Sequence, residues 1–345
     1  MGQFAEYFPG HTLSVEFLAK NAAEEVIPLS FKDIAEEALR VHARKVGPES
    51  MDQYRAALNN WWMPYLAELP ITSIDEDMLE TLDADLEWPS IKTRNNCLIP
   101  LRFVFSKAMK KRIETNGVKV PLIAFDPCLI LENGKPKKTK PDPFTPDERD
   151  LILSHFYQFT GTDALWYHFF IVAFYTGMRT GELLALHWEQ IDFNSSSITV
   201  DRAYSKGRLK QTKTDEIRTF PALPIVMGAL KELKKFTFLQ GGQVFFVPPN
   251  IDQPLIYTKP PARVFQAALR KLGIRQRPTY NTRHTFATVM LMSNVKPGCA
   301  AKVLGHSLAV FFGTYATWIE GEATAEEMAK IQVNDVSNTV KKVAT

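Results

Sequence analysis

Residues 133–143 interrupt this chain. They read Asn-Gly-Lys-Pro-Lys-Lys-Thr-Lys-Pro-Asp-Pro and carry no apolar side chain apart from the prolines. Such a segment has little to bury, and its prolines favour an extended linker. A chain of 345 residues is also too long for one small core. The sequence therefore predicts two domains, over residues 29–132 and 144–320, with tails at 1–28 and 321–345.

The composition is that of a globular protein, with 45% hydrophobic residues. No apolar run reaches the roughly 18 residues of a membrane span. The first residues lack the basic and apolar regions of a secretory signal, so a cytoplasmic location without a membrane partner is expected. Cys97, Cys128 and Cys299 lie far apart without CxxC spacing, which predicts neither a disulfide framework nor a zinc site.

Residues 29–132 are predicted to form an all-α domain of four helices. Ser30 can cap the first, because apolar residues recur after it at helical spacing. Further helix starts are expected near Ser50 and Ser73, and the fourth helix is expected over residues 90–113.

The fourth helix and the linker carry most of the basic residues of this half. A net charge of +3 is mild, so binding of a polyanion must be argued from where the cations lie. One side of the helix can pack while the other meets phosphates, although a solvated basic face explains the same pattern. The candidates for DNA contact are Lys92, Arg94, Lys107, Lys110, Lys135 and Lys137.

The second half begins with a helix start at residues 145–148, Thr-Pro-Asp-Glu. Further on, Arg179 lies between two glycines and two apolar segments, so it should lie close to a core and need an anionic partner. Glu182 could be that partner in a structural ion pair. Residues 197–200 and 208–220 alternate like strands, and Lys213 is expected in the second of two hairpins.

The stretch from residue 279 to 315 suggests chemistry on a phosphodiester. It contains Arg283, His306 and, nine residues later, Tyr315. An arginine can hold two phosphate oxygens, a histidine can donate one more hydrogen bond, and a tyrosine can act as a covalent nucleophile. None of these roles needs a metal.

Together these motifs closely resemble those of the tyrosine recombinases, the phage-integrase family. They are Tyr-Thr-Gly-Met-Arg-Thr-Gly-Glu-Leu-Leu-Ala-Leu-His-Trp at 175–188, Lys213, Thr-Arg-His-Thr-Phe-Ala at 282–287, Leu-Gly-His-Ser at 304–307, and Tyr315. No single motif is decisive, but their shared order and spacing are highly specific.

The resemblance covers residues 31–318 and implies a mainly α protein. Its first half is expected to be a SAM-like four-helix DNA-binding domain of the core type. Its second half is expected to be a mixed α+β catalytic domain with a small antiparallel sheet. The chain looks most like integrases of temperate phages and integrative elements, in which a segment like Phe-Ala-Glu-Tyr-Phe-Pro at residues 4–9 follows an arm-binding domain. Either that domain is naturally absent or it has been removed.

The resemblance also implies roles for individual residues. Arg179 and Arg283 match the two arginines that clamp the scissile phosphate, and His306 matches a further phosphate contact. Lys213 matches a general acid for the 5′-hydroxyl leaving group, and Tyr315 matches the nucleophile. Fixed guanidiniums stabilise the charge of a phosphodiester transition state, and nearby cations should favour the phenolate of the nucleophile.

One position departs from the family pattern. The family usually has His or Lys three residues before the second arginine, and this chain has Tyr280. A phenol titrates far from neutral, which makes Tyr280 a poor proton shuttle and also a rival nucleophile to Tyr315. Glu182 matches a supporting acidic position. His284 is interpreted as a core histidine or one that supports the site without contacting phosphate.

The implied activity is site-specific strand exchange through a 3′-phosphotyrosyl intermediate, without cofactor, metal or ATP. The implied partners are double-stranded DNA recombination sites, further copies of the chain forming a tetramer in the synapse, and accessory DNA-bending proteins. The tail at 321–345 either packs on a neighbouring protomer or frays. Action on the bacterial nucleoid is expected. Two alternatives stay open: a relaxing enzyme resembling type IB topoisomerases, and a catalytically impaired DNA-binding protein with an architectural or regulatory role.

Overall fold

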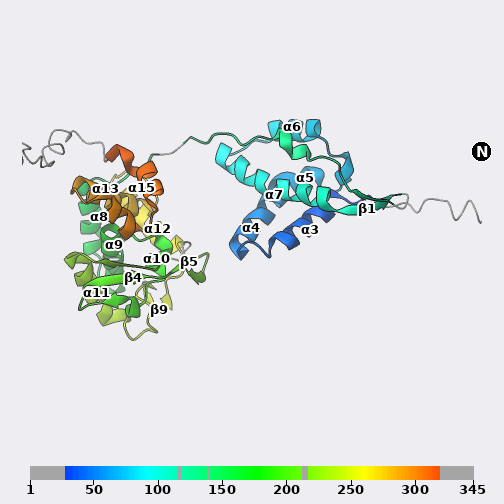
Figure 1. The fold of residues 1–345 in the computed structure, drawn as a ribbon. Helices are drawn as coiled ribbons and strands as arrows, with labels where there is room; N and C mark the ends of the chain where they lie inside the picture. Colours follow the sequence, from blue (N-terminus) through cyan, green and yellow to red (C-terminus); the bar gives the residue numbers. More distant parts are fainter. Residues whose placement is uncertain (1–27, 116–117, 138–139, 212–216, 319–345) are drawn as a thin grey trace, which may run out of the picture. The chain divides into compact units, whose positions relative to one another are not determined.

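The computed structural model describes residues 28–115, 118–137, 140–211 and 217–318. The chain divides into two compact units, Met1–Lys138 and Thr139–Thr345 (Figure 1). This division falls inside the segment predicted as the linker. The two tails, at 1–27 and 319–345, lie outside the described residues, so the prediction for the C-terminal tail stays a prediction.

The first unit is built on helices that pack around one apolar core. Ser30 caps the first helix in a capping box with Asp33, as the sequence predicts for its start. Phe31 at that start packs against Phe105, with ring centroids 6.0 Å apart. The helical elements are α3 (Phe31–His42), α4 (Pro48–Ala57), the π-helix Leu58–Trp62, α5 (Met63–Leu66), the 3-10 turn Ile71–Ser73, α6 (Glu76–Asp85), α7 (Ile91–Lys110) and the 3-10 turn Pro127–Ile130.

The fourth helix ends earlier than the sequence predicted. Helix α7 stops at Lys110, because Lys111 adopts an extended backbone with φ −74° and ψ 128°. Strand β1 (Arg112–Thr115) then pairs antiparallel with β2 (Val118–Pro121). The prediction of a helix to residue 113 was therefore wrong. The basic residues before residue 113 favour the end of a helix. Residues 116–117, however, read Asn-Gly, which is a strong signal for a hairpin and was overlooked beside the helical pattern.

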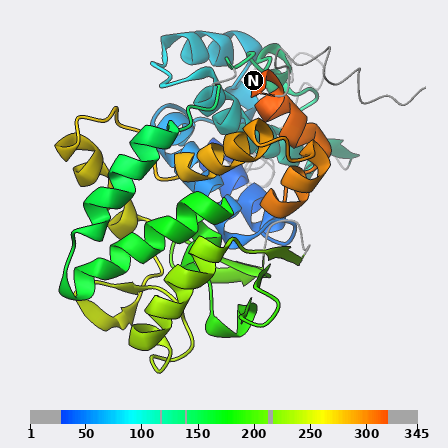
Figure 2. The same ribbon diagram turned by 90° about the vertical axis from the view of Figure 1, so that its left-hand side faces the viewer.

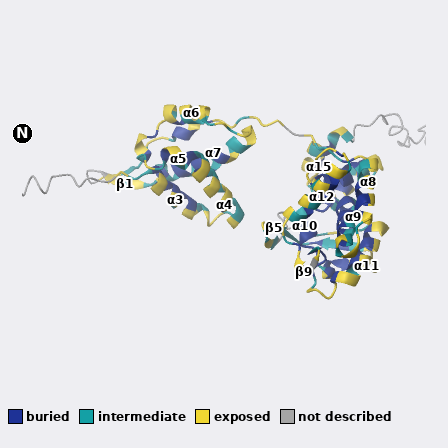
Figure 3. Ribbon diagram, turned by 180° about the vertical axis from the view of Figure 1, so that it is seen from behind, coloured by how far each residue is buried: buried dark blue, intermediate teal, exposed yellow. Residues whose placement is uncertain are grey.

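Helix α9 (Leu165–Thr176) forms the centre of the second unit. Nine of its twelve residues are buried, and Figure 3 shows it mostly in dark blue. Thr145 caps the preceding helix in a capping box with Glu148, which confirms the predicted helix start. The other helical elements are α8 (Pro146–Tyr157), Gly161–Ala164, α10 (Thr180–Leu184), Trp188–Gln190, α11 (Pro224–Thr237), α12 (Lys259–Lys271), α13 (Asn281–Met292), α14 (Pro297–Leu304), α15 (Leu308–Tyr315) and Ala316–Trp318.

The strands of this unit are short and antiparallel. The predicted second hairpin over residues 208–220 does not form, because its two strands pair with different partners. Strand β6 (Arg208–Gln211) pairs with β5 (Arg202–Ser205), whereas β7 (Arg218–Pro221) pairs with β4 (Ser197–Val200). Lys213, between β6 and β7, lies outside the described residues. The remaining strands are β3 (Ile191–Asp192), which extends the β4–β7 sheet, and the pair β8 (Phe246–Val247) and β9 (Asn250–Pro254).

The predicted fold class, mainly α with a small antiparallel sheet in the second domain, is confirmed. The first domain was predicted to be all-α, but it also contains the β1–β2 hairpin. Within the described ranges, no helix has the length and apolar character needed to cross a membrane. The three cysteines are free, and two of them, Cys97 and Cys128, are buried.

Candidate active site

Two helix ends meet at the centre of the candidate site. Helix α9 ends at Gly177 and α14 ends at Gly305, with φ of +60° and +65°. A Cβ on Gly177 would lie 2.6 Å from a methyl group of Leu304, so only glycine fits there. Helices α13, α14 and α15, coloured gold to orange in Figure 2, pack beside these ends. Helix C-termini present unpaired carbonyls, which attract cations.

Arg283 on α13 is the cation that these carbonyls hold. It is fully buried. Its Nη1 donates to the Gly177 carbonyl at 2.7 Å, and its Nη2 donates to the Leu304 carbonyl at 2.6 Å. The same Nη2 lies 2.7 Å from Nε2 of His306, while Nε–H of Arg283 has no partner among the described residues. The side chain is therefore fixed, with a donor left for a ligand.

Arg179 lies at the start of α10 and is held by Glu182. The Glu182 carboxylate accepts from Nη1 of Arg179 at 2.8 Å and from its backbone N–H at 2.8 Å. Nη2 of Arg179 donates to the Gly305 carbonyl at 2.9 Å. The predicted ion pair forms, but the Arg179 side chain is 36% exposed, so this guanidinium faces solvent as well as the core.

Arg218 is a third arginine of the cluster, and it was not among the predicted site residues. From strand β7 it donates Nη1 and Nη2 to the two Glu182 oxygens, at 3.1 and 2.6 Å, and Nε to the Val303 carbonyl at 3.0 Å. No local pattern marks it, because its contacts come from a strand packed against the end of α14. Arg218 ties the α10 start to the loop that carries His306.

The cluster has a surplus of positive charge. Among the described residues, Glu182 is the one carboxylate that accepts from any of Arg179, Arg218 and Arg283. Burial alone would raise the pKa of Glu182, but the hydrogen bonds and charges of the arginines lower it. Burial, and then the charge of Arg179, lower the pKa of Arg283 to about 10. An anion bound here would relieve this repulsion.

Tyr315 lies at the end of α15, beside this cluster. The Tyr315 side chain is fully buried. Its ring is inclined by 25° to that of His306, with centroids 6.3 Å apart. Its hydroxyl lies 2.8 Å from Nδ1 of His284 on α13. The structure thus brings Arg179, Arg283, His306 and Tyr315 together, as their motifs predict for a shared site.

The positive charge acts on the phenol in the expected direction, but burial has the larger effect on its pKa. The charge of Arg283 does lower the pKa of Tyr315, but burial outweighs it and raises that pKa above the ordinary value. Burial, followed by the charges of Arg283 and Arg179, lowers the pKa of His306 to about 3. At neutral pH the phenol therefore keeps its proton and His306 is neutral.

Tyr280 stands at the edge of the site, at the start of α13. It is 39% exposed, and its ring meets that of His284 edge-on, with centroids 5.1 Å apart. Its hydroxyl makes no hydrogen bond within the described part of the chain, whereas that of Tyr315 does. This contrast favours Tyr315 over Tyr280 as the reactive phenol.

The candidate DNA contacts of the first unit divide into two groups. Arg94 forms a bidentate ion pair with the Asp83 carboxylate, whose closest contact is 2.6 Å. Lys107 forms an ion pair with Glu37 at 2.9 Å. Both cations therefore stabilise the fold itself. The pattern of charges in the sequence could not show this, because it does not reveal which carboxylate each cation meets. The other four candidates are exposed and stay predicted DNA contacts: Lys92, Lys110, Lys135 and Lys137.

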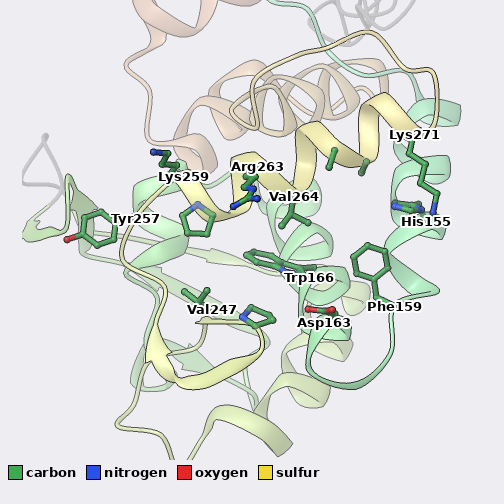
Figure 4. Close-up of a pocket in the computed structure, with 14 residues that line it drawn as sticks. His155, Phe159, Asp163, Trp166, Val247, Tyr257, Lys259, Arg263, Val264 and Lys271 are labelled. Carbon is green, nitrogen blue, oxygen red and sulfur yellow. The ribbon is translucent and has the colours of Figure 1, made fainter.

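A cavity of about 850 Å³ opens at the other end of α9 (Figure 4). Trp166, near the start of α9, lines it together with Val264 and Arg263 of α12. Helix α9 has 12 residues, which at 1.5 Å per residue places this cavity roughly 18 Å from Gly177. None of the residues of the arginine cluster lines it, so it is separate from the candidate site.

The mainly α fold and the buried tyrosine beside clustered arginines are those of a tyrosine recombinase. The profile of the phage integrase family matches residues 144–317, just over half of the chain. The chain therefore belongs to the phage integrase family, and it is a site-specific tyrosine recombinase.

Relatives of known sequence agree with this family. The chain is 24% identical over 339 residues to the putative defective protein IntQ of Escherichia coli strain K12, across 86% of this chain and 82% of that protein. It is 28% identical over 207 residues to the prophage integrase IntR of the same strain, across 53% of this chain and 49% of that protein.

Solved structures share the fold at low identity. The Tn1549 transposon integrase in complex with a circular intermediate DNA matches with a TM-score of 0.69 and 16% identity, over 88% of this chain and 98% of that one. A lambda integrase tetramer bound to a Holliday junction matches with a TM-score of 0.64 and 16% identity, over 89% and 85%.

Proposed function

We propose that this recombinase cuts and rejoins double-stranded DNA through a 3′-phosphotyrosyl bond at Tyr315, and that it integrates or excises a mobile element. The observation that carries the proposal is the cluster of three guanidiniums beside that tyrosine, of which Arg179 and Arg218 share the buried Glu182 carboxylate and Arg283 has no carboxylate partner among the described residues. A phosphodiester supplies the missing negative charge, and its transition state gathers more charge on the nonbridging oxygens.

In the proposed reaction, Arg179 and Arg283 hold the nonbridging oxygens of the scissile phosphate, with His306 beside them. The Tyr315 oxygen attacks phosphorus, the bond from phosphorus to the 5′ oxygen breaks, and Lys213 gives the leaving oxygen its proton. The phosphotyrosyl bond conserves the energy of the broken one, so rejoining needs no ATP. Because Tyr315 has no exposed surface, the groups that cover it must move aside before DNA can reach its hydroxyl.

DNA sites and a tetramer are the proposed partners. The solved relatives include integrases bound to circular intermediate DNA and a tetramer on a Holliday junction, which supports both parts. The exposed lysines of the first unit and of the linker would contact the DNA backbone. Accessory DNA-bending proteins and action on the bacterial nucleoid complete the proposal.

A trapped covalent adduct tests this function. A binding site is first selected from a random duplex pool, and the protein is then given that site with a nick beside the scissile phosphate. Wild type should form a protein–DNA adduct that survives denaturation. Tyr315→Phe should bind the site but form none, and Arg179→Ala and Arg283→Ala should lose most of the cleavage rate.

Four outcomes would contradict the proposal. An adduct formed by Tyr315→Phe would refute the role of Tyr315 as the nucleophile. Normal cleavage by the arginine variants would refute the role of Arg179 and Arg283 in holding the scissile phosphate. Relaxation of supercoiled plasmids of any sequence by a monomer would identify a topoisomerase-like enzyme instead. Tight, specific binding by wild type without any adduct would identify an impaired DNA-binding protein.

A further inference from the structure

His284 contacts the reacting oxygen of the proposed nucleophile. It follows Arg283 on α13, and its Nδ1 lies 2.8 Å from the hydroxyl of Tyr315 on α15. The two side chains are 31 positions apart in the sequence. A nucleophile and a base within about 2.6–3.2 Å have the geometry of general-base catalysis. This contact with a reacting atom goes beyond the predicted role of His284, which was that of a core or supporting histidine.

The surroundings of His284 keep it neutral. Burial, and then the charge of Arg283, lower its pKa below the ordinary value. The groups that face it are Arg283 and Tyr280 on its own helix, Tyr315 on α15, and His306 from the loop between α14 and α15. Within the described residues no carboxylate hydrogen-bonds to it. A neutral imidazole has a free lone pair, which a buried phenol requires if it is to lose its proton.

The site needs such an acceptor. Tyr280 stands where the family usually has His or Lys, and a phenol cannot take a proton at neutral pH. Tyr280 also lies partly exposed and makes its contact with the His284 ring rather than with the Tyr315 hydroxyl. His284 is the imidazole on the same helix that does reach that hydroxyl.

We propose that His284 is the general base that deprotonates Tyr315, in place of the residue that Tyr280 replaces. This inference rests on the proposed function. As the Tyr315 oxygen bonds to phosphorus, its O–H bond breaks and Nδ1 of His284 takes the proton, while the bond from phosphorus to the 5′ oxygen breaks. In the rejoining step the proton returns from Nδ1 to the phenol as it leaves.

Two substitutions separate proton transfer from positioning. The side-chain amide of His284→Asn lies near the place of Nδ1, so it can keep a hydrogen bond to the phenol but cannot take its proton. His284→Ala removes both. Adduct formation is measured on the selected site with sulfur in place of the bridging 5′ oxygen, because a thiolate leaves without an acid. A slower reaction on this substrate therefore reports a defect in the attack of the Tyr315 oxygen on phosphorus.

Both variants should bind the DNA and melt as wild type does, and near pH 7 both should form the adduct about 100-fold more slowly. The deficit should shrink as the pH rises towards the pKa of the phenol, because hydroxide then replaces the base. In wild type, the rate should fall as the pH drops through the pKa of His284, which burial and the charge of Arg283 place below 6.5.

Three results would overturn the proposal. His284→Asn could cleave as fast as wild type, which would leave His284 a positioning residue. His284→Ala could cleave faster than wild type, which would show that the contact only holds Tyr315 back. Tyr280→Phe could cost more than His284→Asn, which would assign the proton to Tyr280. If wild type itself forms no adduct, the proposed function fails instead.

Discussion

Replacing Glu182 with glutamine should destabilise the second unit severely. Glu182 is 2% exposed and accepts four hydrogen bonds, from the backbone and Nη1 of Arg179 and from both terminal nitrogens of Arg218. The amide has no charge, and its NH₂ group cannot accept from a guanidinium. Glu182→Gln therefore leaves the arginines without a counter-ion in a buried place.

The size of the loss follows from the burial of each partner. Removing one member of a buried ion pair costs about 3–5 kcal/mol. Arg179 is 36% exposed and partly solvated, so the loss falls mainly on Arg218, whose side chain is 9% exposed. We expect about 3 kcal/mol, which for a domain of this size lowers the melting temperature by roughly 6–12 °C.

Thermal unfolding of the full chain measures this loss, with Glu232→Gln as the control. Glu232 also pairs with a cation, Lys235, but both side chains are more than half exposed, so its loss should leave the melting temperature unchanged. A melting curve of Glu182→Gln that coincides with that of wild type would refute the reasoning.

The pH dependence gives the same prediction a second test. Because the folded pKa of Glu182 is lowered from 4.5, its stabilising effect is complete above pH 4.5 and disappears as the pH falls through the lowered value. The gap between wild type and Glu182→Gln should therefore close in acid. A gap that stays constant on acidification would show that shape, not charge, causes the loss.

Three further predictions concern five single substitutions. Gly177→Ala should lower the stability by about 1–2 kcal/mol or more, because its φ is positive and the new methyl group meets Leu304. Gly228→Ala, at an open position on α11, should raise the stability by about 0.5–1 kcal/mol. Equal effects of the two substitutions would contradict both predictions. Thr145→Ala should cost about 1 kcal/mol through the lost cap of α8, and urea unfolding without a shift would refute this. Lys92→Gln should lower the slope of log DNA affinity against log salt concentration by about 1. Arg94→Gln should instead lower the melting temperature, because its ion pair with Asp83 is lost. The reverse pattern would show that Arg94 contacts DNA and that Lys92 stabilises the fold.

The sequence predicted those parts of the structure that local patterns determine. Ser30 and Thr145 are capping residues followed by acids three positions later, and both cap helices as expected. Arg179, Arg283, His306 and Tyr315 were recognised through motifs, and the structure brings them together. A motif carries this information because each of its residues has one task in a shared site.

The contacts that the sequence could not predict join residues far apart in the chain. Arg218 reaches Glu182 from 36 positions away, and His284 meets Tyr315 from 31. Neither pair leaves a periodic or compositional signal, because strand β7 and helix α15 position them only after packing. The pairing of Lys107 with Glu37 is hidden for the same reason, so a basic helix face looked more available than it is.

The central claim, that Tyr315 forms the covalent bond to DNA, is tested most directly by finding the atom that carries the DNA. Wild-type adduct on the selected nicked site is digested with protease and nuclease, and the modified peptide is identified by mass spectrometry. We predict a nucleotide joined through its 3′ phosphate to Tyr315. A nucleotide on Tyr280, or one joined through its 5′ phosphate, would contradict the account.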